Sequence, residues 1–345
     1  MKALVKSARG AGHMSIREVD EPAPGPGQVR VRVKWTGICG TDVHIASGAF
    51  FHYFPPLILG HEFSGEIDAL GEGVEGISVG DRVTAEPTKS SCGSCPHCAG
   101  GNYNRCDERD IAGVVSDGAF TNYVVTRAES IHRLPDSVSL KAGALMEPLA
   151  VCVHGLTEQC RLAEGDTVLV VGPGPIGLGC AQVAMAHGAR VIIAGLPRDA
   201  DRLAMAGRLG VFRAVNVEEE DLGAIVREAT GGWGADLAVE AVGGAAAVRS
   251  CIENVRKGGQ MLQVGLPGRP AEVNLDLLAW KEIRLTGTFG QKYSAWRTAL
   301  RLLEEGRVDT EAMVTDILPL ERWQEGFGMM ERGEGLKILL EPSPL

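Results

Sequence analysis

Four cysteines crowd into one short stretch of the chain, at Cys92, Cys95, Cys98 and Cys106. Such close spacing lets neighbouring thiolates face one ion, and tetrahedral Zn²⁺ takes four soft ligands of this kind. The glycines and the proline between them let the segment wrap around an ion. A redox-active Cys-x-x-Cys pair is the alternative, but the third and fourth cysteines favour a closed, structural zinc site.

A second, dispersed set of potential metal ligands consists of Cys39, His61, Glu62 and Glu147. One thiolate, one imidazole and one carboxylate would leave the fourth zinc position open for water or an alcohol, as in a catalytic site. The spacing does not choose between the two glutamates, and a lone histidine or glutamate is more often structural or exposed. The cysteine cluster and the nucleotide motif described next support the catalytic interpretation.

The third motif is Gly172–Gly177, which reads G-x-G-x-x-G and directly follows an apolar, β-branched run. In a strand–turn–helix unit, the first glycine makes the turn, the second admits a pyrophosphate and the third lets helix and strand pack closely. The start of the helix then offers free N–H groups to the phosphates. A plain glycine-rich turn is the alternative. The βαβ context favours a dinucleotide site built from Gly172, Gly174, Pro175, Ile176 and Gly177.

The next predicted strand is directly followed by Gly195, the position where NAD-binding folds place a carboxylate for the ribose hydroxyls. Loss of that acid removes an acceptor and the charge that repels a 2′-phosphate, and Arg198 and Arg202 could pair with such a phosphate. The alternative is that both arginines are solvated and that Asp199 or Asp201 reaches the ribose. This segment slightly favours NADP over NAD.

Two kinds of segment must position these residues. Residues 1 to about 150 hold short alternating strands and glycine turns, as in Val29–Lys34, which predicts a β-rich, barrel-like half. From about residue 165 the chain alternates strand, glycine and helix, which predicts right-handed βαβ units and a parallel sheet. The predicted strands of the second half are Thr167–Val171, Arg190–Ala194, Ala235–Val239, Gly259–Val264 and Ile283–Phe289. The predicted helices are Ile176–His187, Asp199–Leu209, Ala295–Glu305 and Leu320–Arg332, and a last strand is predicted at Leu336–Leu340.

Length and composition exclude several classes of protein. With 345 residues, 45% of them hydrophobic and 23% charged, the chain is typical of a two-domain globular protein. The sequence holds no apolar run of transmembrane length, and its start lacks the apolar core of a signal peptide. A net charge of −10 disfavours nucleic acid and anionic membranes as partners. Nine cysteines, an odd number, predict a reducing compartment and hence a cytoplasmic location.

Together these motifs resemble the zinc-containing medium-chain dehydrogenase/reductase family of alcohol, polyol and threonine dehydrogenases. The resemblance spans essentially the whole chain and includes Gly37–His44, Gly60–Gly65, Gly80–Val83, the four-cysteine segment, Glu147–Leu149, Gly172–Gly177 and Gly335–Leu340. It implies an α/β protein with a GroES-like catalytic domain over 1–152, a doubly wound Rossmann domain over 153–290, and a return of 291–345 to the catalytic domain. It also implies a homo-oligomer, either a dimer or a tetramer.

The resemblance assigns a role to each potential ligand of the dispersed set. Cys39 and His61 match the catalytic-zinc ligands, and Glu62 matches the third ligand of polyol dehydrogenases. Glu147 matches a carboxylate that either ligates the zinc or hydrogen-bonds its water. With the four-cysteine segment, the implied content is two zinc ions per chain, one catalytic and one structural.

The resemblance also implies a proton relay and contacts to the cofactor. Thr41 and His44 match residues that carry the proton of the substrate hydroxyl, by way of the nicotinamide ribose, to solvent. The nicotinamide end of the cofactor would be contacted by Val264, Gly265, Leu266, Thr288 and Phe289.

The activity implied is reversible, zinc-dependent hydride transfer between a secondary alcohol, polyol-like in character, and NAD(P). Residues Ile45–Phe54 stand where threonine dehydrogenases carry a tryptophan-containing segment. We expect this aromatic segment either to line the substrate pocket or to pack on the core. Animal sorbitol dehydrogenases carry an Arg-Tyr pair where this chain has Gly290–Tyr293, so Lys292 or Tyr293 is the candidate substitute. The alternatives are a threonine dehydrogenase-like enzyme, a zinc-independent NADPH quinone or enone reductase, and a non-enzymatic zinc- and nucleotide-binding protein.

Overall fold

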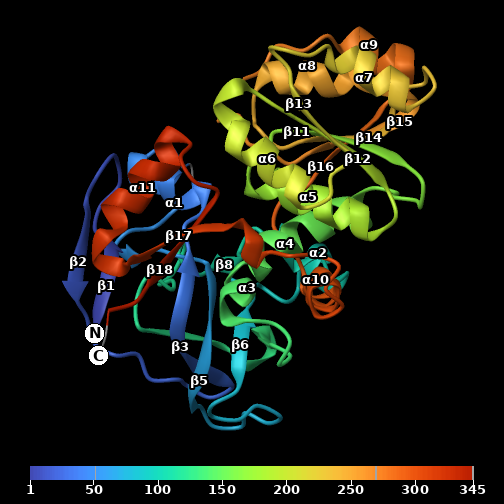
Figure 1. Ribbon diagram of the computed structural model, residues 1–345. Coiled ribbons are helices and arrows are strands. Elements are labelled where there is room, and N and C mark those ends of the chain that lie inside the picture. The colour runs from blue at the N-terminus through green and yellow to red at the C-terminus, as the bar shows by residue number, and fades with distance from the viewer. Residues whose placement is uncertain (51, 269, 344–345) are drawn as a thin grey trace. The chain divides into compact units, whose positions relative to one another are not determined.

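The computed structural model describes residues 1–50, 52–268 and 270–343, which form two compact units (Figure 1). The first unit comprises Met1–Glu147, Gln291–Glu304 and Thr310–Leu345, and the second comprises Pro148–Gly290 and Glu305–Asp309. The domain boundaries expected from the sequence, after residues 152 and 290, stay a prediction. None of the helices in the described ranges is both long enough and apolar enough to cross a membrane.

A seven-stranded sheet forms the centre of the first unit, as the alternating patterns predict. Val29, Val31 and Val33 of its long strand β3 are buried on one face against Phe63 and Ile67. The strand order is β10-β6-β5-β3-β18-β17, with β9 also pairing with β3. The strands are β3 (Gln28–Gly37), β5 (Glu62–Leu70), β6 (Arg82–Ala85), β9 (Tyr123–Arg127), β10 (Ile131–Arg133), β17 (Val314–Pro319) and β18 (Lys337–Glu341).

A second core of the first unit lies between a small sheet and two helices. The sheet has the order β2-β1-β4, and Leu4 of β1 is fully buried together with Ile45 and Phe327 from helices α1 and α11. Helix α11 begins at Trp323 because residues 320–322 form a separate 3₁₀ turn, so the predicted start at Leu320 is three residues early. The elements are β1 (Lys2–Lys6), β2 (Met14–Glu18), β4 (Leu57–Ile58), α1 (Gly40–Ser47) and α11 (Trp323–Arg332).

The segment from 92 to 106, here called the cysteine loop, is flanked by the short strands β7 (Thr88–Ser90) and β8 (Asp110–Ile111). The loop holds helix α2 (Pro96–Ala99) and a 3₁₀ turn over Tyr103–Arg105. The first unit also contains α3 (Leu140–Ala144) and α10 (Tyr293–Glu304), while α4 (Met146–Val153) begins at the end of the first unit.

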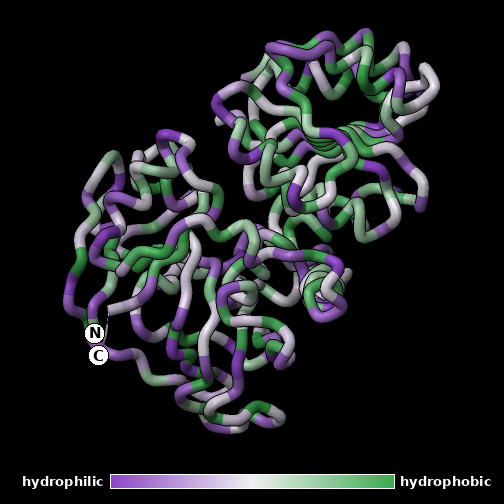
Figure 2. The backbone as a smooth tube through the Cα atoms, in the orientation of Figure 1, coloured by the Kyte–Doolittle hydropathy of each residue, from purple (hydrophilic) through white to green (hydrophobic). Residues whose placement is uncertain are grey.

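The second unit is built on a six-stranded, entirely parallel sheet with the order β13-β12-β11-β14-β15-β16. This is the order of a doubly wound dinucleotide-binding sheet, which binds its ligand beyond the carboxyl ends of the strands where the order reverses. The hydrophobic strands at its centre stand out in Figure 2, and Val168–Val170 are fully buried. The strands are β11 (Thr167–Val171), β12 (Arg190–Gly195), β13 (Arg213–Asn216), β14 (Ala235–Glu240), β15 (Val255–Gln263) and β16 (Arg284–Gly287).

Helices cover both faces of this sheet, as the strand–helix alternation predicts. Side chains of α7 and α8 pack with Leu169 and Ile192 in one core, and α5 and α6 lie on the other face (Figure 1). The helices are α5 (Pro175–Ala186), α6 (Ala200–Arg208), α7 (Leu222–Ala229), α8 (Ala245–Asn254) and α9 (Leu275–Lys281). Strand β16 is an edge strand and is shorter than the predicted Ile283–Phe289.

Candidate metal centre and nucleotide site

Three of the four dispersed ligands meet in the first unit. Cys39 precedes α1, His61 precedes β5 and Glu62 begins β5, and one potential ligand atom of each lies within 4.8 Å of the others. Gly60 turns the chain into this position with φ 93°, and a side chain there would collide with Phe120. The positive φ and the crowding both require glycine, so the backbone at Gly60 sets where His61 points.

Asp42 contacts both Cys39 and His61. Its Oδ2 accepts a hydrogen bond of 2.9 Å from the Cys39 backbone N–H, and its Oδ1 lies 3.7 Å from His61 Nδ1. Burial alone would lower the pKa of His61, but the charges of Asp42 and Cys39 outweigh it and raise that pKa well above the ordinary value. A buried carboxylate behind a histidine is the arrangement that orients a metal-ligating imidazole.

The donor set of this cluster fits zinc. A thiolate, an imidazole and a carboxylate are its usual ligands, and the potential ligand atoms of Cys39, His61 and Glu62 lie within 4.8 Å of one another. Because His61 Nδ1 faces the Asp42 carboxylate, Nε2 is the nitrogen that would hold the metal.

Glu62 is paired with a buried lysine that the sequence analysis did not single out. Lys337 of β18 contacts both carboxylate oxygens of Glu62, Oε1 at 2.6 Å, and also donates to the Ile38 carbonyl at 3.1 Å. Burial opposes the charge of Lys337, but Glu62 and Cys39 outweigh it and raise the pKa of the lysine. A charged residue inside the apolar run Leu336–Leu340 was the available signal.

Glu147, the fourth predicted ligand, lies on α4 and is not one of the three that cluster within 4.8 Å. Its Oε1 accepts a hydrogen bond of 2.9 Å from Gln291 Nε2, and both side chains are buried. Burial raises the pKa of Glu147, although the neighbouring charge of His61 works against that shift. Gln291 was missed because nothing in its local sequence marks it.

Lys292 and Tyr293, the predicted substitutes for an Arg-Tyr pair, contact the cysteine loop. Lys292 Nζ donates to Asn102 Oδ1 at 3.1 Å, and the Tyr293 N–H donates to the Tyr103 hydroxyl at 2.6 Å. Both contacts are directed to the loop, and it is Gln291 that reaches Glu147.

The predicted relay residues lie on α1, directly after Cys39. Thr41 is half-buried and His44 is exposed, and their spacing of three residues places both on one face of the helix. Of the aromatic segment that follows, Tyr53 is buried in the core and its hydroxyl accepts a hydrogen bond of 2.9 Å from the Gly10 N–H. Phe54 is exposed, and Phe51 lies outside the described residues.

The cysteine loop brings the sulfur atoms of Cys92, Cys95, Cys98 and Cys106 within 4.8 Å of one another, and all four cysteines are free thiols. Backbone N–H groups point at the sulfurs, with the Cys95 N–H 3.3 Å from Cys92 Sγ. These N–H groups, led by that of Cys95, lower the pKa of Cys92 to about 6. Four converging sulfurs of this kind fit a closed, tetrahedral zinc site.

The glycine motif of the second unit forms the turn between β11 and α5. Gly172 has φ 105°, and a side chain on Gly177 would lie 1.8 Å from the Gly172 carbonyl oxygen. Gly174, the N-cap of α5, faces open space, and Pro175 and Ile176 begin the helix. A cavity of about 730 Å³ lies beside this turn, and its lining includes Gly172, Gly195, Arg198, Asp199, Val242 and Asn254. The cavity and the free helix N-terminus suit a dinucleotide.

The packing around Gly195 explains why β12 ends in glycine and not in an acid. A side chain on Gly195 would lie 2.8 Å from the Pro173 ring, so the position is sterically restricted to glycine. Arg198 is exposed and lines the cavity. Arg202 does not line it, and its guanidinium lies 3.6 Å from Asp199 Oδ1.

The five residues predicted to contact nicotinamide follow the carboxyl ends of β15 and β16. The Val264 and Gly265 N–H groups both donate to the Glu240 carbonyl at 3.0 Å, and the Thr288 N–H donates to the Gln263 carbonyl at 3.1 Å. Leu266 and Phe289 are exposed. These residues therefore stand at the edge of the sheet where such folds bind ligands.

The family models "Alcohol dehydrogenase GroES-like domain" and "Zinc-binding dehydrogenase" match residues 25–136 and 175–305. The chain is 45% identical to sorbitol dehydrogenase of Halalkalibacterium halodurans over 99% of both proteins. It is 38% identical to D-arabitol-phosphate dehydrogenase of Enterococcus avium, over 100% of this chain and 98% of the relative.

A solved structure of a zinc-binding dehydrogenase from Sinorhizobium meliloti 1021, bound to NADP, superposes with a TM-score of 0.89 at 30% identity over 99% of both chains. These matches confirm the predicted fold class, a GroES-like unit combined with a Rossmann unit, and the predicted dehydrogenase class.

Proposed function

The chain belongs to the zinc-containing medium-chain dehydrogenase family, and on that premise we propose that it oxidises a secondary hydroxyl of a polyol reversibly to a ketone, with NAD(P) as hydride acceptor. The observation that carries this proposal is the convergence of Cys39, His61 and Glu62 beside the buried Asp42 and Lys337. A quinone or enone reductase without catalytic zinc would leave this buried cluster without a purpose.

Each residue of the cluster has a defined task in this proposal. Cys39 and His61 hold the metal together with a glutamate, and Asp42 keeps the imidazole in place. A zinc ion bound there supplies a Lewis acid that lowers the pKa of a substrate hydroxyl. The Thr41 hydroxyl would accept the substrate's proton while passing its own proton on, and the exposed His44 would release a proton to solvent.

Glu62 and Glu147 have different hydrogen-bond partners, and this difference bears on which of them is the third metal ligand. Both oxygens of Glu62 are engaged by Lys337, whereas Glu147 has one oxygen engaged by the neutral amide of Gln291. We therefore propose Glu147 as the carboxylate that completes or contacts the metal site, with Glu62 held back by its lysine.

The test is replacement of Cys39 by serine. Cys39→Ser should lower turnover of polyols at least about 100-fold, since removal of a metal ligand removes the Lewis acid, while dinucleotide binding to the second unit persists. The readouts are reduced-nicotinamide absorbance with a pool of polyols, threonine and secondary alcohols, and bound zinc per chain. Cys160→Ser, a half-buried cysteine outside both metal sites, is the control. Full activity of Cys39→Ser would overturn the proposal.

For the cofactor we propose NADP in preference to NAD. Gly195 excludes the ribose-binding acid, and Arg198 is the exposed cation on the cavity wall. Arg198→Ala should raise the KM for NADP about 10-fold or more and leave that for NAD nearly unchanged, because only the 2′-phosphate pairs with the guanidinium. Equal use of both cofactors by the parent protein would contradict this preference.

Four further expectations belong to the same proposal. The cysteine loop holds a second, structural zinc, so two ions per chain are proposed. The substrate is a polyol, its phosphate ester or an amino alcohol such as threonine, and the pool of the test, with polyol phosphates added, distinguishes them. A cytoplasmic location agrees with nine free cysteines.

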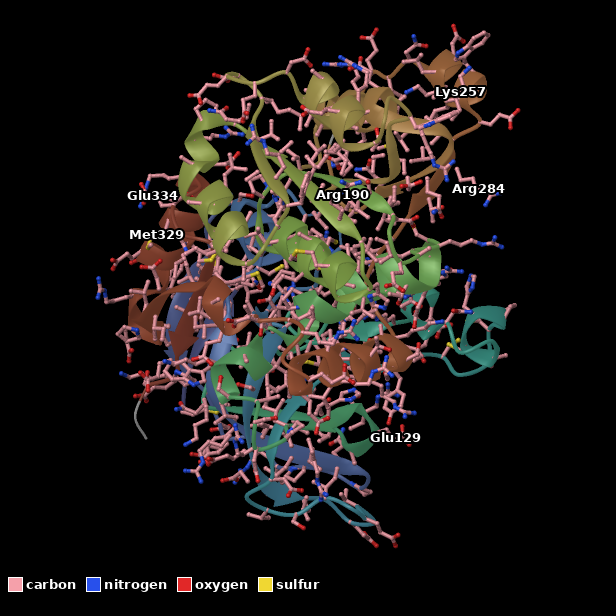
Figure 3. All side chains as sticks on the ribbon, turned by 45° about the vertical axis from the view of Figure 1, so that its right-hand side comes forward. Glu129, Arg190, Lys257, Arg284, Met329 and Glu334 are labelled. Atoms are coloured by element: carbon pink, nitrogen blue, oxygen red, sulfur yellow. The ribbon has the colours of Figure 1, made fainter. Side chains whose placement is uncertain are left out.

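A homo-oligomer is supported by edge strand β16, where Leu285 is exposed and Arg284 projects outward (Figure 3). Light scattering would give the size of the oligomer.

A further inference from the structure

Two consecutive residues of the cysteine loop contact two consecutive residues at the start of α10. Asn102 Oδ1 accepts from Lys292 Nζ at 3.1 Å, and the Tyr103 hydroxyl oxygen accepts from the Tyr293 backbone N–H at 2.6 Å. The first N–H groups of a helix have no acceptor within it. Tyr103, although distant in sequence, therefore caps the N-terminus of α10.

Tyr103 is itself held rigidly. Its hydroxyl donates to Glu86 Oε2 at 2.5 Å, and His132 Nε2 lies 3.3 Å from the other oxygen of the same carboxylate. The His132 ring stacks on Trp296, one turn into α10, with centroids 5.0 Å apart. Glu86, His132 and Trp296 are buried, so the loop and the helix are joined by a connected network of polar and aromatic contacts.

Two residues before this capped start lies Gln291, whose Nε2 donates to Glu147 Oε1 at 2.9 Å. Gln291 and Glu147 are buried. A shift of the backbone at Tyr293 moves Gln291, two residues earlier, and with it the only hydrogen bond that the described residues make to this carboxylate.

We propose that the cysteine loop positions Glu147: Tyr103 fixes the start of α10, and Gln291 transmits that position to the carboxylate. Tyr103 and Gln291 are positioning residues, because neither is among the proposed metal ligands. The inference rests on the proposed function, in which Glu147 completes or contacts the catalytic metal. It makes the structural metal loop a determinant of catalytic-site geometry as well as of stability.

The experiment measures Co²⁺ binding to the catalytic site, with the cysteine-loop zinc retained, by the visible d–d spectrum. Tyr103→Phe keeps the ring and removes the hydroxyl, and Gln291→Leu removes the amide. Both should weaken Co²⁺ binding about 10–100-fold, as losses behind a metal ligand do, and shift the d–d bands in the same direction. The double variant should show no more than the larger single effect, because the two residues act in series. Tyr123→Phe, on β9, should leave affinity and spectrum unchanged.

The outcomes separate the two proposals. Unchanged Co²⁺ affinity and spectrum in Glu147→Gln and Gln291→Leu would overturn the placement of Glu147 in the metal site, and the coupling with it. An altered Gln291→Leu with an unchanged Tyr103→Phe would overturn the coupling alone. If Tyr103→Phe fails to fold with its loop zinc, Lys292→Met is used instead, because it removes the hydrogen bond from Lys292 to Asn102. An unchanged Co²⁺ spectrum of Lys292→Met would then overturn the coupling.

Discussion

At the scale of single residues, the charge balance of the metal cluster depends on Lys337. Glu62 and Lys337 are both buried, with 1% and 3% of their side chains exposed, and each satisfies the other. Removing one partner of such a pair leaves an unpaired charge buried in a medium of low polarity. The resulting loss of folding free energy is far larger than the net contribution of the intact pair. The same lysine also offsets the negative charge that Cys39 and Glu147 bring to the site.

We therefore expect Lys337→Met to lower the free energy of unfolding of the metal-free protein by about 3–5 kcal/mol. The double variant Lys337→Met/Glu62→Gln should recover most of that loss, since it removes the stranded charge as well. Urea unfolding followed by tryptophan fluorescence measures both. Lys2→Met is the control, because its pair with Glu321 is exposed and should contribute less than about 1 kcal/mol. Equal losses for Lys337→Met and Lys2→Met would contradict this account.

At the scale of elements, the turn between β11 and α5 separates a structural glycine from a ligand-facing one. A side chain on Gly177 would lie 1.8 Å from the backbone oxygen of Gly172, whereas one on Gly174 would meet no atom within 4 Å. Neither residue has a positive φ. Packing therefore requires glycine at Gly177, whereas at Gly174 we propose that glycine leaves room for the pyrophosphate.

This difference predicts opposite outcomes for two alanine substitutions. Gly177→Ala should lower the midpoint of thermal unfolding by several degrees, because backbone must move to admit the methyl group. Gly174→Ala should leave that midpoint within about one degree and weaken dinucleotide binding at least about 10-fold, because the methyl group occupies the approach of the pyrophosphate. Calorimetry of unfolding and of dinucleotide binding gives both values. Intact binding by Gly174→Ala would place the pyrophosphate elsewhere.

At the scale of the whole molecule, the last residues of the chain return to the first. Strand β18, near the end of the chain, lies between β3 and β17 in the sheet of the first unit. Glu321 connects residues near both ends of the chain, since Lys2 Nζ donates to its Oε1 at 2.8 Å and Ser343 Oγ at 2.5 Å. The hydrogen bond from Lys2, followed by that from Ser343, lowers the pKa of Glu321 to about 2.

Because the pKa of Glu321 is lowered in the folded protein, its ionised form stabilises the fold at pH values above the ordinary pKa of 4.5. This contribution is lost as the pH falls towards about 2. Glu321→Gln should therefore lose stability at pH 7, by no more than about 1 kcal/mol because the pair is largely exposed. The difference from the parent should shrink progressively below pH 4.5, as urea unfolding at several pH values would measure. Glu325→Gln, whose pair with Arg322 stays within one turn, is the control. A difference that stays constant from pH 7 to pH 3 would refute the assignment.

The sequence by itself was sufficient for features that depend on local spacing. The glycine motif and the cysteine loop are recognisable because each is set by its own few residues, whereas Cys39, His61 and Glu62 were assigned through the family resemblance. The alternation of apolar residues likewise predicted the β-rich first unit and the parallel sheet of the second, although β16 and α11 proved shorter than expected.

Tertiary structure decided which side chains complete the site. Lys337 reaches Glu62 across 275 residues, Gln291 reaches Glu147 across 144, and Tyr103 reaches Tyr293 across 190. None of these pairs has a local signature, and the role predicted for Lys292 or Tyr293 at the substrate stays a prediction. Whether two distant residues meet depends on strand order, such as β18 beside β3, and strand order follows from burying apolar faces of the whole chain together.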